Sequence, residues 1–189
     1  MHVPESDRWI ATDLDHLPEN GLRYEVLNGQ LIVNAAPKPI HQWVVTELRD
    51  AIKPALPPGA FALLGVGVLI GDDEPIPDLM IAADPIPWTD RGIAADQVML
   101  AVEVVSRSTT LTDRMVKPVL YADARIPNYW RIETNRFKGQ LPGESLPVLF
   151  AFVLDDDGEY QLAHRAPAGE IVTLHSPFEF TVDPGTLLP

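Results

Sequence analysis

The chain has 189 residues and no cysteine, and its 27 acidic and 14 basic side chains give a formal charge of −13. This length suits one domain, residues 1–189, that is large enough to bury a hydrophobic core. Without cysteine the chain has no disulfide framework, no thiolate metal site and no cysteine nucleophile, so a bound metal needs oxygen or imidazole ligands.

The charge and the apolar segments bear on the location of the protein and on its binding partners. The start of the chain lacks a basic region followed by an apolar one, and no apolar run is long enough to span a bilayer. We therefore expect a soluble, cytoplasmic protein with no membrane partner. The net charge repels a polyanion unless the charges are segregated. Basic residues do gather in one part of the chain, at Arg107, Arg114, Lys117, Arg125 and Arg131.

The first predicted element is a hairpin formed by residues 23–27 and 30–33. Asn28 and Gly29 lie between these two runs, and both tolerate the positive φ of a two-residue turn. One face of the hairpin is wholly apolar, and we expect it to pack on the core: Tyr24, Val26, Leu31 and Val33. Glu25 lies on the other face, which is free to border a cleft or solvent.

A helix and three strands are predicted next. Apolar residues recur at helical spacing over 40–52, and Pro54 ends the pattern. Short β-rich runs bounded by Gly, Pro or Asp follow at 61–70, 78–82 and 98–105. The order so far is therefore hairpin, helix and three strands.

A second helix is predicted over 109–124. Its apolar residues are roughly aligned: Leu111, Met115, Val119 and Ala122. Pro118 removes one backbone hydrogen bond and is expected to kink this helix. A strand at 126–132 and a loop at 134–147 follow. The chain then ends in a β-meander built from 148–154, 160–163, 171–174 and 178–182.

Two isolated carboxylates and one lysine stand out against this pattern. Asp78 follows a proline at a strand edge, and Glu103 lies inside the apolar run 98–105. A carboxylate in such a run is costly unless it is paired, hydrogen-bonded or bound to a cation. Lys117 lies on the following helix, which can bring it to the same place. A divalent metal held near these residues is one explanation of the pattern.

Several motifs of the chain form a familiar set: residues 24–29, 39–42, Pro77-Asp78, Val102-Glu103-Val104-Val105-Ser106, Asp113-Arg114 with Lys117, Tyr121-Ala122 and residues 126–130. With these motifs the chain resembles, over about residues 20–135, the Uma2 family, within the restriction-endonuclease-like superfamily whose hallmark is PD-(D/E)XK. The resemblance implies an α/β fold with a restriction-endonuclease-like core (helix, three strands, helix, strand), an N-terminal β-hairpin and a C-terminal β extension at 148–183.

The resemblance also implies a metal site. Asp78 and Glu103, with the backbone carbonyl of Val104, would hold Mg²⁺ or Mn²⁺. The superfamily places a lysine two residues after the second acid, where this chain has Val105. Lys117 takes that role from the following helix, where it would orient the attacking water or stabilise the transition state.

Two further residues have implied roles, and each candidate also has a simpler interpretation. Glu25 would be an additional ligand or supporting acid, and His41 a phosphate contact or proton-transfer group. Alternatively, Glu25 lies on an exposed strand and His41 is a polar residue at a helix start. Asp78 could equally be a turn aspartate, Glu103 a partner of a buried arginine, and Lys117 a solvated helix lysine paired one turn away.

The predicted function is hydrolysis of phosphodiester bonds by a metal-dependent endonuclease, with DNA as substrate in preference to RNA. Two cuts in a duplex require two sites, so we expect a homodimer, formed through the apolar C-terminal third. The alternative is a catalytically inactive nuclease fold that serves as a binding or regulatory module.

Overall fold

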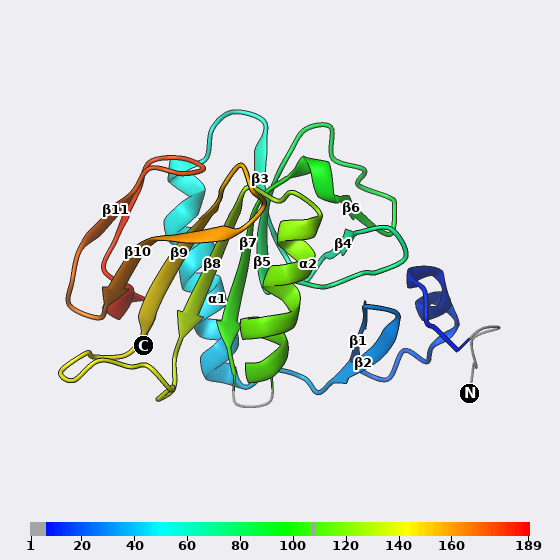
Figure 1. Cartoon of the computed structure of the whole chain (residues 1–189), viewed down its shortest axis with the longest axis horizontal. Helices are drawn as coiled ribbons and strands as arrows, with labels where there is room; N and C mark the ends of the chain where they lie inside the picture. Colours follow the sequence, from blue (N-terminus) through cyan, green and yellow to red (C-terminus); the bar gives the residue numbers. More distant parts are fainter. Residues whose placement is uncertain (1–6, 107–108) are drawn as a thin grey trace.

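The computed structural model of the protein describes residues 7–106 and 109–189. A six-stranded mixed sheet lies at its centre, in the order β10-β9-β8-β7-β5-β3 (Figure 1). Its strands are β3 (Ala60–Leu64), β5 (Leu79–Ala83), β7 (Val98–Val105), β8 (Asn128–Glu133), β9 (Val148–Leu154) and β10 (Tyr160–Pro167). Within this sheet β7 and β8 pair in parallel, and the other neighbouring strands are antiparallel. The predicted α/β class is confirmed.

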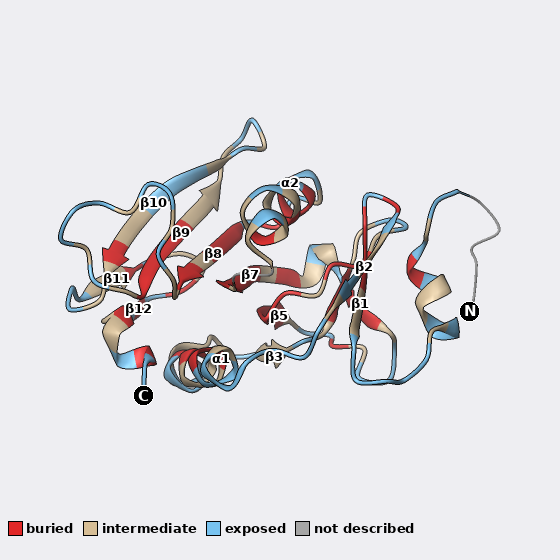
Figure 2. Cartoon of the chain, turned by 90° about the horizontal axis from the view of Figure 1, so that it is seen from below, coloured by how far each residue is buried: buried red, intermediate tan, exposed pale blue. Residues whose placement is uncertain are grey.

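One helix covers each face of the sheet, as Figure 2 shows from below. Helix α1 (Pro39–Ile52) packs its apolar side chains against one face, where Val44 and Leu48 meet Val102 and Trp130 in a continuous core. Helix α2 (Lys117–Asp123) covers the other face and forms the crossover that a parallel pair such as β7 and β8 requires.

The predicted hairpin forms with the predicted turn. Strands β1 (Arg23–Leu27) and β2 (Gln30–Asn34) pair in their own two-stranded sheet, and Asn28 and Gly29 have φ values of 53° and 73°. The prediction for its core face was wrong in part. Val33 is 49% exposed, whereas Glu25 on the opposite face is buried. The hairpin stands beside the main sheet rather than on it (Figure 2), so its Glu25 face borders the end of that sheet.

The predicted strand over 61–70 is two strands. Gly65 adopts a positive φ of 61° after β3, and the chain turns away into β4 (Gly67–Leu69). Strand β4 pairs in parallel with β6 (Gly92–Ala94), and together they form a small sheet beside the face that α2 covers. The remaining short helical turns are η1 (Ala11–His16), η2 (Lys53–Ala55), η3 (Ala95–Gln97) and η5 (Pro184–Leu187).

The second predicted helix contains a widened turn. Residues Thr112–Val116 (η4) form a π-helical segment directly before α2, and the Lys117 N–H donates to the carbonyl of Thr112, five residues back. Pro118 explains the irregularity, because it has no N–H to donate and its ring crowds the preceding turn. The expected disturbance at Pro118 therefore takes the form of a π-bulge.

This helix does not turn its apolar line to the sheet. Leu111, Met115 and Val119 are 71%, 63% and 58% exposed, although Ala122 is buried. The side chains that point inward from η4 and α2 include Asp113 and Lys117.

The C-terminal third divides between two sheets. Strands β9 and β10 extend the main sheet, while β11 (Val172–Leu174) and β12 (Phe180–Val182) pair separately on the face that α1 covers (Figure 2). Phe180 stacks on Trp130 with ring centroids 5.8 Å apart, which ties this small sheet to the core. Within the described residues, no helix is long and apolar enough to cross a membrane.

Candidate active site

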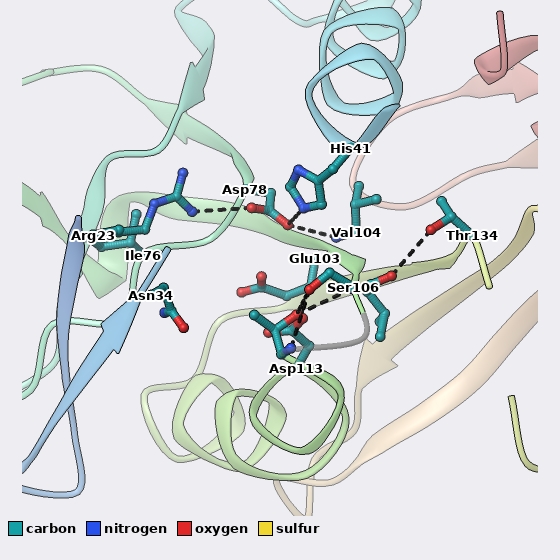
Figure 3. Close-up of polar contacts among 12 residues, drawn as sticks. Arg23, Asn34, His41, Ile76, Asp78, Glu103, Val104, Ser106, Asp113 and Thr134 are labelled. Carbon is teal, nitrogen blue, oxygen red and sulfur yellow. Dashed lines mark hydrogen bonds and ion pairs between the residues drawn. The ribbon is translucent and has the colours of Figure 1, made fainter. Parts of the chain in front are cut away.

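A cavity of about 570 Å³ opens where five elements meet: the hairpin, the first turn of α1, the start of β5, the end of β7 and the η4 segment before α2 (Figure 3). The side chains predicted for the site all line it: Glu25, His41, Asp78, Glu103 and Lys117. Asp113 lines it too, although the sequence suggested it only as a neighbour of Lys117.

Lys117 lies at the centre of a buried carboxylate cluster. Its Nζ is 2.9 Å from Glu25 Oε1, 3.1 Å from Glu103 Oε1 and 4.0 Å from Asp113 Oδ1, and it donates to the carbonyl of Ile76 at 2.9 Å. Burial opposes the charge, but the carboxylates outweigh it and raise the pKa of Lys117. The side chain is 5% exposed, so Lys117 is a buried ammonium and not a solvated helix lysine.

Glu103 is held by the same lysine and by a tyrosine. The Tyr121 hydroxyl donates to Glu103 Oε1 at 2.8 Å, and the same oxygen lies 3.1 Å from Lys117 Nζ. Burial raises the pKa of Glu103 well above its ordinary value, and the charge of Lys117 offsets this only in part. Its cationic partner is therefore Lys117 and not an arginine.

Asp78 is held by three donors from three different elements. His41 Nε2 lies 3.0 Å from Oδ2, the Val104 N–H donates to Oδ2 at 2.9 Å, and Arg23 donates to Oδ1 at 3.2 Å. Burial alone would raise the pKa of Asp78, but the hydrogen bond and charge of His41, with the charge of Lys117, lower it. Asp78 is thus fixed in a buried hydrogen-bond network at the cavity.

His41 connects α1 to this network. Burial lowers its pKa, but the hydrogen bond and the charge of Asp78 outweigh burial, so the net pKa is raised. With Nε2 bonded to Asp78, the buried Nδ1 has no hydrogen-bond partner within the described part of the chain. His41 therefore has one ring nitrogen committed to the network and one unused.

Glu25 faces the site and not the solvent. Its side chain accepts hydrogen bonds from the Ile76 N–H at 2.6 Å and from Asn34 Nδ2 at 2.7 Å, and the residue is 1% exposed. Arg23 is a site residue that the sequence reasoning missed. The strand period could have found it, because residues two apart on a strand share a face, as Arg23 and Glu25 do here.

With this geometry established, the comparisons place the chain in a family. The family Uma2, described as "Putative restriction endonuclease", matches residues 11–185. The chain belongs to the Uma2 family. A crystal structure described as a "putative nuclease belonging to DUF820", from Anabaena variabilis ATCC 29413, superposes with a TM-score of 0.65 at 18% identity, over 88% of this chain and 89% of that one. No curated protein matches this Uma2 chain in sequence.

These matches confirm the resemblance and the nuclease-like fold. The likeness to the solved structure carries the fold alone, because the two sequences share few identities. Membership of the Uma2 family supports a nuclease-like function for this protein in general terms, without a particular substrate or metal.

The predicted gathering of basic residues separates in space. Arg107 lies outside the described residues. Arg125 lies just past the C-terminal end of α2 and contacts the carbonyl of Asp156. Arg114 and Arg131 instead flank Glu133 on the sheet.

The donor chemistry of the Uma2 site fits a divalent cation. Four carboxylates border the cavity, and among the described residues the permanently charged side chains that bond to them are Arg23 and Lys117, with Lys38 also at the cavity lining. Carboxylate oxygens are the ligands that Mg²⁺ and Mn²⁺ prefer. Within residues 7–106 and 109–189, no three His, Asp or Glu side chains already surround a single point. Lys117 Nζ lies between two of the carboxylates, so the fit rests on the carboxylate oxygens gathered at the cavity rather than on a preformed cage.

Proposed function

We propose that this Uma2 protein, acting as one nuclease-like domain, is a metal-dependent endonuclease that hydrolyses phosphodiester bonds of DNA. The observation that carries the proposal is the buried cluster of three carboxylates around Lys117, with Asp78 beside it at the same cavity. Buried charge of this kind is costly to the fold, and such clusters concentrate at catalytic sites.

In this proposal Asp78 and Glu103, with the Val104 carbonyl, hold Mg²⁺ or Mn²⁺. A bound divalent ion polarises the phosphoryl group and lowers the pKa of a bound water. The Val104 N–H is already engaged with Asp78 Oδ2, which fixes this carboxylate beside the end of β7. Tyr121 and Lys117 both contact Oε1 of Glu103, which leaves Oε2 as the oxygen that would bind the ion.

The remaining residues prepare the site for an anionic substrate. The raised pKa keeps Lys117 protonated at neutral pH, so it can donate to the attacking water or to a phosphoryl oxygen. Glu25 holds this ammonium in place through its 2.9 Å ion pair. His41, with Nδ1 unused, can donate to a phosphate oxygen when it is protonated.

Two further expectations belong to the proposal. A homodimer would supply the two sites needed for cleavage of both strands, and light scattering of the purified protein measures this directly. The cytoplasmic location remains a prediction from the sequence.

A cleavage assay tests the proposal. Supercoiled plasmid and single-stranded DNA are incubated at low salt with Mg²⁺ or Mn²⁺, using the wild type, Glu103→Ala, Lys117→Ala and the control Glu47→Ala on α1. We expect cleavage that requires the metal, persists in the control and disappears in both site variants while circular dichroism shows folded protein. If the wild type leaves DNA and RNA intact, the inactive binding module becomes the better description.

A further inference from the structure

We infer that the part of the sheet next to α2 is a docking face for the sugar-phosphate backbone of the nucleic acid, and that it guides the strand into the cavity. This inference rests on the proposed function and extends it to substrate binding. The docking face is formed by Arg114, Arg131 and Arg165 with Phe137, Phe150 and Phe152, and by Arg136 and Lys138, which flank Phe137 in the chain.

Three arginines of the docking face lie over aromatic rings. The Arg131 guanidinium is 4.7 Å from the ring centre of Phe150, and that of Arg165 is 4.9 Å from the same centre. Arg114 lies 5.7 Å from the centre of Phe137. Stacking on a ring holds a guanidinium in one orientation, and the loss of hydration is small because this group is weakly hydrated. The side chains remain 17% to 25% exposed, so they can still reach a ligand.

The charge of this face is opposite to that of the protein as a whole. Two carboxylates accompany its five cations: Glu133, which is buried between Arg114 and Arg131, and Glu144, which pairs with Arg165. Arg136 and Lys138 are exposed, and the described residues offer neither of them an ion-pair partner. On a chain of charge −13, such a local excess of positive charge favours a polyanion.

The docking face is continuous with the cavity. Thr134 and Asn135 line the cavity and directly follow β8, and Arg136 is the next residue. On the other side, Arg114 follows the cavity residue Asp113 on the helix. Figure 1 shows the loop 134–147 at the end of the sheet where β7 and β8 finish. A strand whose scissile phosphate lies in the cavity would therefore pass directly onto these cations.

Binding measurements separate this inference from catalysis. In the background of Glu103→Gln, Arg136→Ala/Lys138→Ala is compared with Arg49→Ala/Lys53→Ala, which removes the same charge at the far end of α1. Fluorescence anisotropy follows a labelled 30-nucleotide DNA in EDTA at several salt concentrations. We expect about tenfold weaker binding and a salt slope reduced by about 1 to 2 for the docking-face pair, with less than a twofold change for the control. Equal effects of the two pairs would overturn the inference.

Cleavage measurements in the otherwise unmodified protein complete the test. For Arg136→Ala/Lys138→Ala we expect a raised KM for long DNA, with kcat and the hydrolysis of bis(p-nitrophenyl) phosphate unchanged. An inactive wild type would refute the proposed function and leave the anisotropy result to decide the docking face. If the variant loses DNA binding because it changes from dimer to monomer in light scattering, the face joins copies of the chain and the inference is wrong.

Discussion

The two helices that cover the sheet differ in whether they bury charged side chains. Helix α1 turns Val44, Leu48 and Ile52 inward, and all three are fully buried. The η4 and α2 segment also packs apolar side chains such as Leu120 at its C-terminal end, but it turns Asp113 and Lys117 inward and leaves most of its predicted apolar line exposed. The first helix therefore contributes hydrophobic packing against the sheet, whereas the second also delivers charge to the cavity.

The difference has a physical cause in what each helix meets. The face of the sheet under α1 is apolar, so hydrophobic burial decides the orientation of that helix. The face under η4 and α2 carries Glu103, and Glu25 approaches from the hairpin. A buried carboxylate needs a cation, so ion pairing with Lys117 overrides the aliphatic line of the helix.

The largest expected effect is on the cleavage rate of a Glu103 variant, in which activity and stability should change differently. We expect Glu103→Gln to lower cleavage on the order of 10³-fold, because a ligand and charge of the site are lost. Its free energy of unfolding should not fall, because burial raises the pKa of this carboxyl and makes its ionised form costly. Plasmid nicking and urea unfolding at pH 7 measure the two quantities. Lost stability in this variant, with Glu47→Gln unaffected, would contradict the account.

A second prediction removes the buried cation and keeps the length of its side chain. Lys117→Met should lower the free energy of unfolding by about 3–5 kcal/mol at pH 8, since it leaves the buried carboxylates without their ammonium. Lys53→Met at the exposed end of α1 should change it by less than about 0.5 kcal/mol. This loss in the free energy of unfolding should be smaller at pH 5. Burial raises the pKa of Asp113 to about 6, so this carboxyl is protonated and uncharged at pH 5. Urea titrations at both pH values supply the comparison.

Truncating one aliphatic side chain on each helix tests whether the two helices differ in how much their aliphatic side chains stabilise the fold. Leu48→Ala on α1 should cost about 2–5 kcal/mol, because it opens a cavity in the core. Met115→Ala should cost less than about 0.5 kcal/mol, since Met115 is 63% exposed. Thermal and chemical unfolding of both variants measure this, and similar losses would mean that η4 and α2 also pack through their aliphatic line.

The smallest predicted effect is a pH-dependent gain in the free energy of unfolding when Asp113 is replaced by asparagine. The folded pKa of about 6 lies above the ordinary 3.8, so the folded state favours the protonated carboxyl. The stability from this preference is fully present below pH 4 and is lost as the pH rises through about 6. Asp113→Asn should therefore raise the free energy of unfolding by about 1–3 kcal/mol at pH 8 in EDTA, and by nothing near pH 4. A gain that does not depend on pH would point to another cause.

Local signals in the sequence predicted much of the fold. Asn28 and Gly29 are sufficient for the hairpin turn, and the helical spacing over 40–52 correctly predicted α1. Both depend on neighbours close in the sequence, for which the backbone rules are strong. The split of the 61–70 run could not be predicted in this way, because β4 pairs with β6 more than twenty residues later.

The sequence indicated most of the residues that gather at the candidate site, but not which of them contact one another. Isolated acids in apolar surroundings indicated Asp78 and Glu103, and the structure places both at one cavity. Their partners come from distant elements, with Glu25 reaching Lys117 from the hairpin and Arg23 reaching Asp78. The apolar spacing in 109–124 indicated the helix but not its orientation, because only the folded sheet brings Glu103 under it.

The most direct test of the central claim is calorimetric titration of Mn²⁺ and Mg²⁺ into the wild type, Asp78→Asn, Glu103→Gln and the control Glu47→Gln. We expect saturable binding to the wild type and the control, and loss of that binding in both site variants while the protein remains folded. No binding to the wild type, or equal binding to all four proteins, would contradict a metal centre built from Asp78 and Glu103.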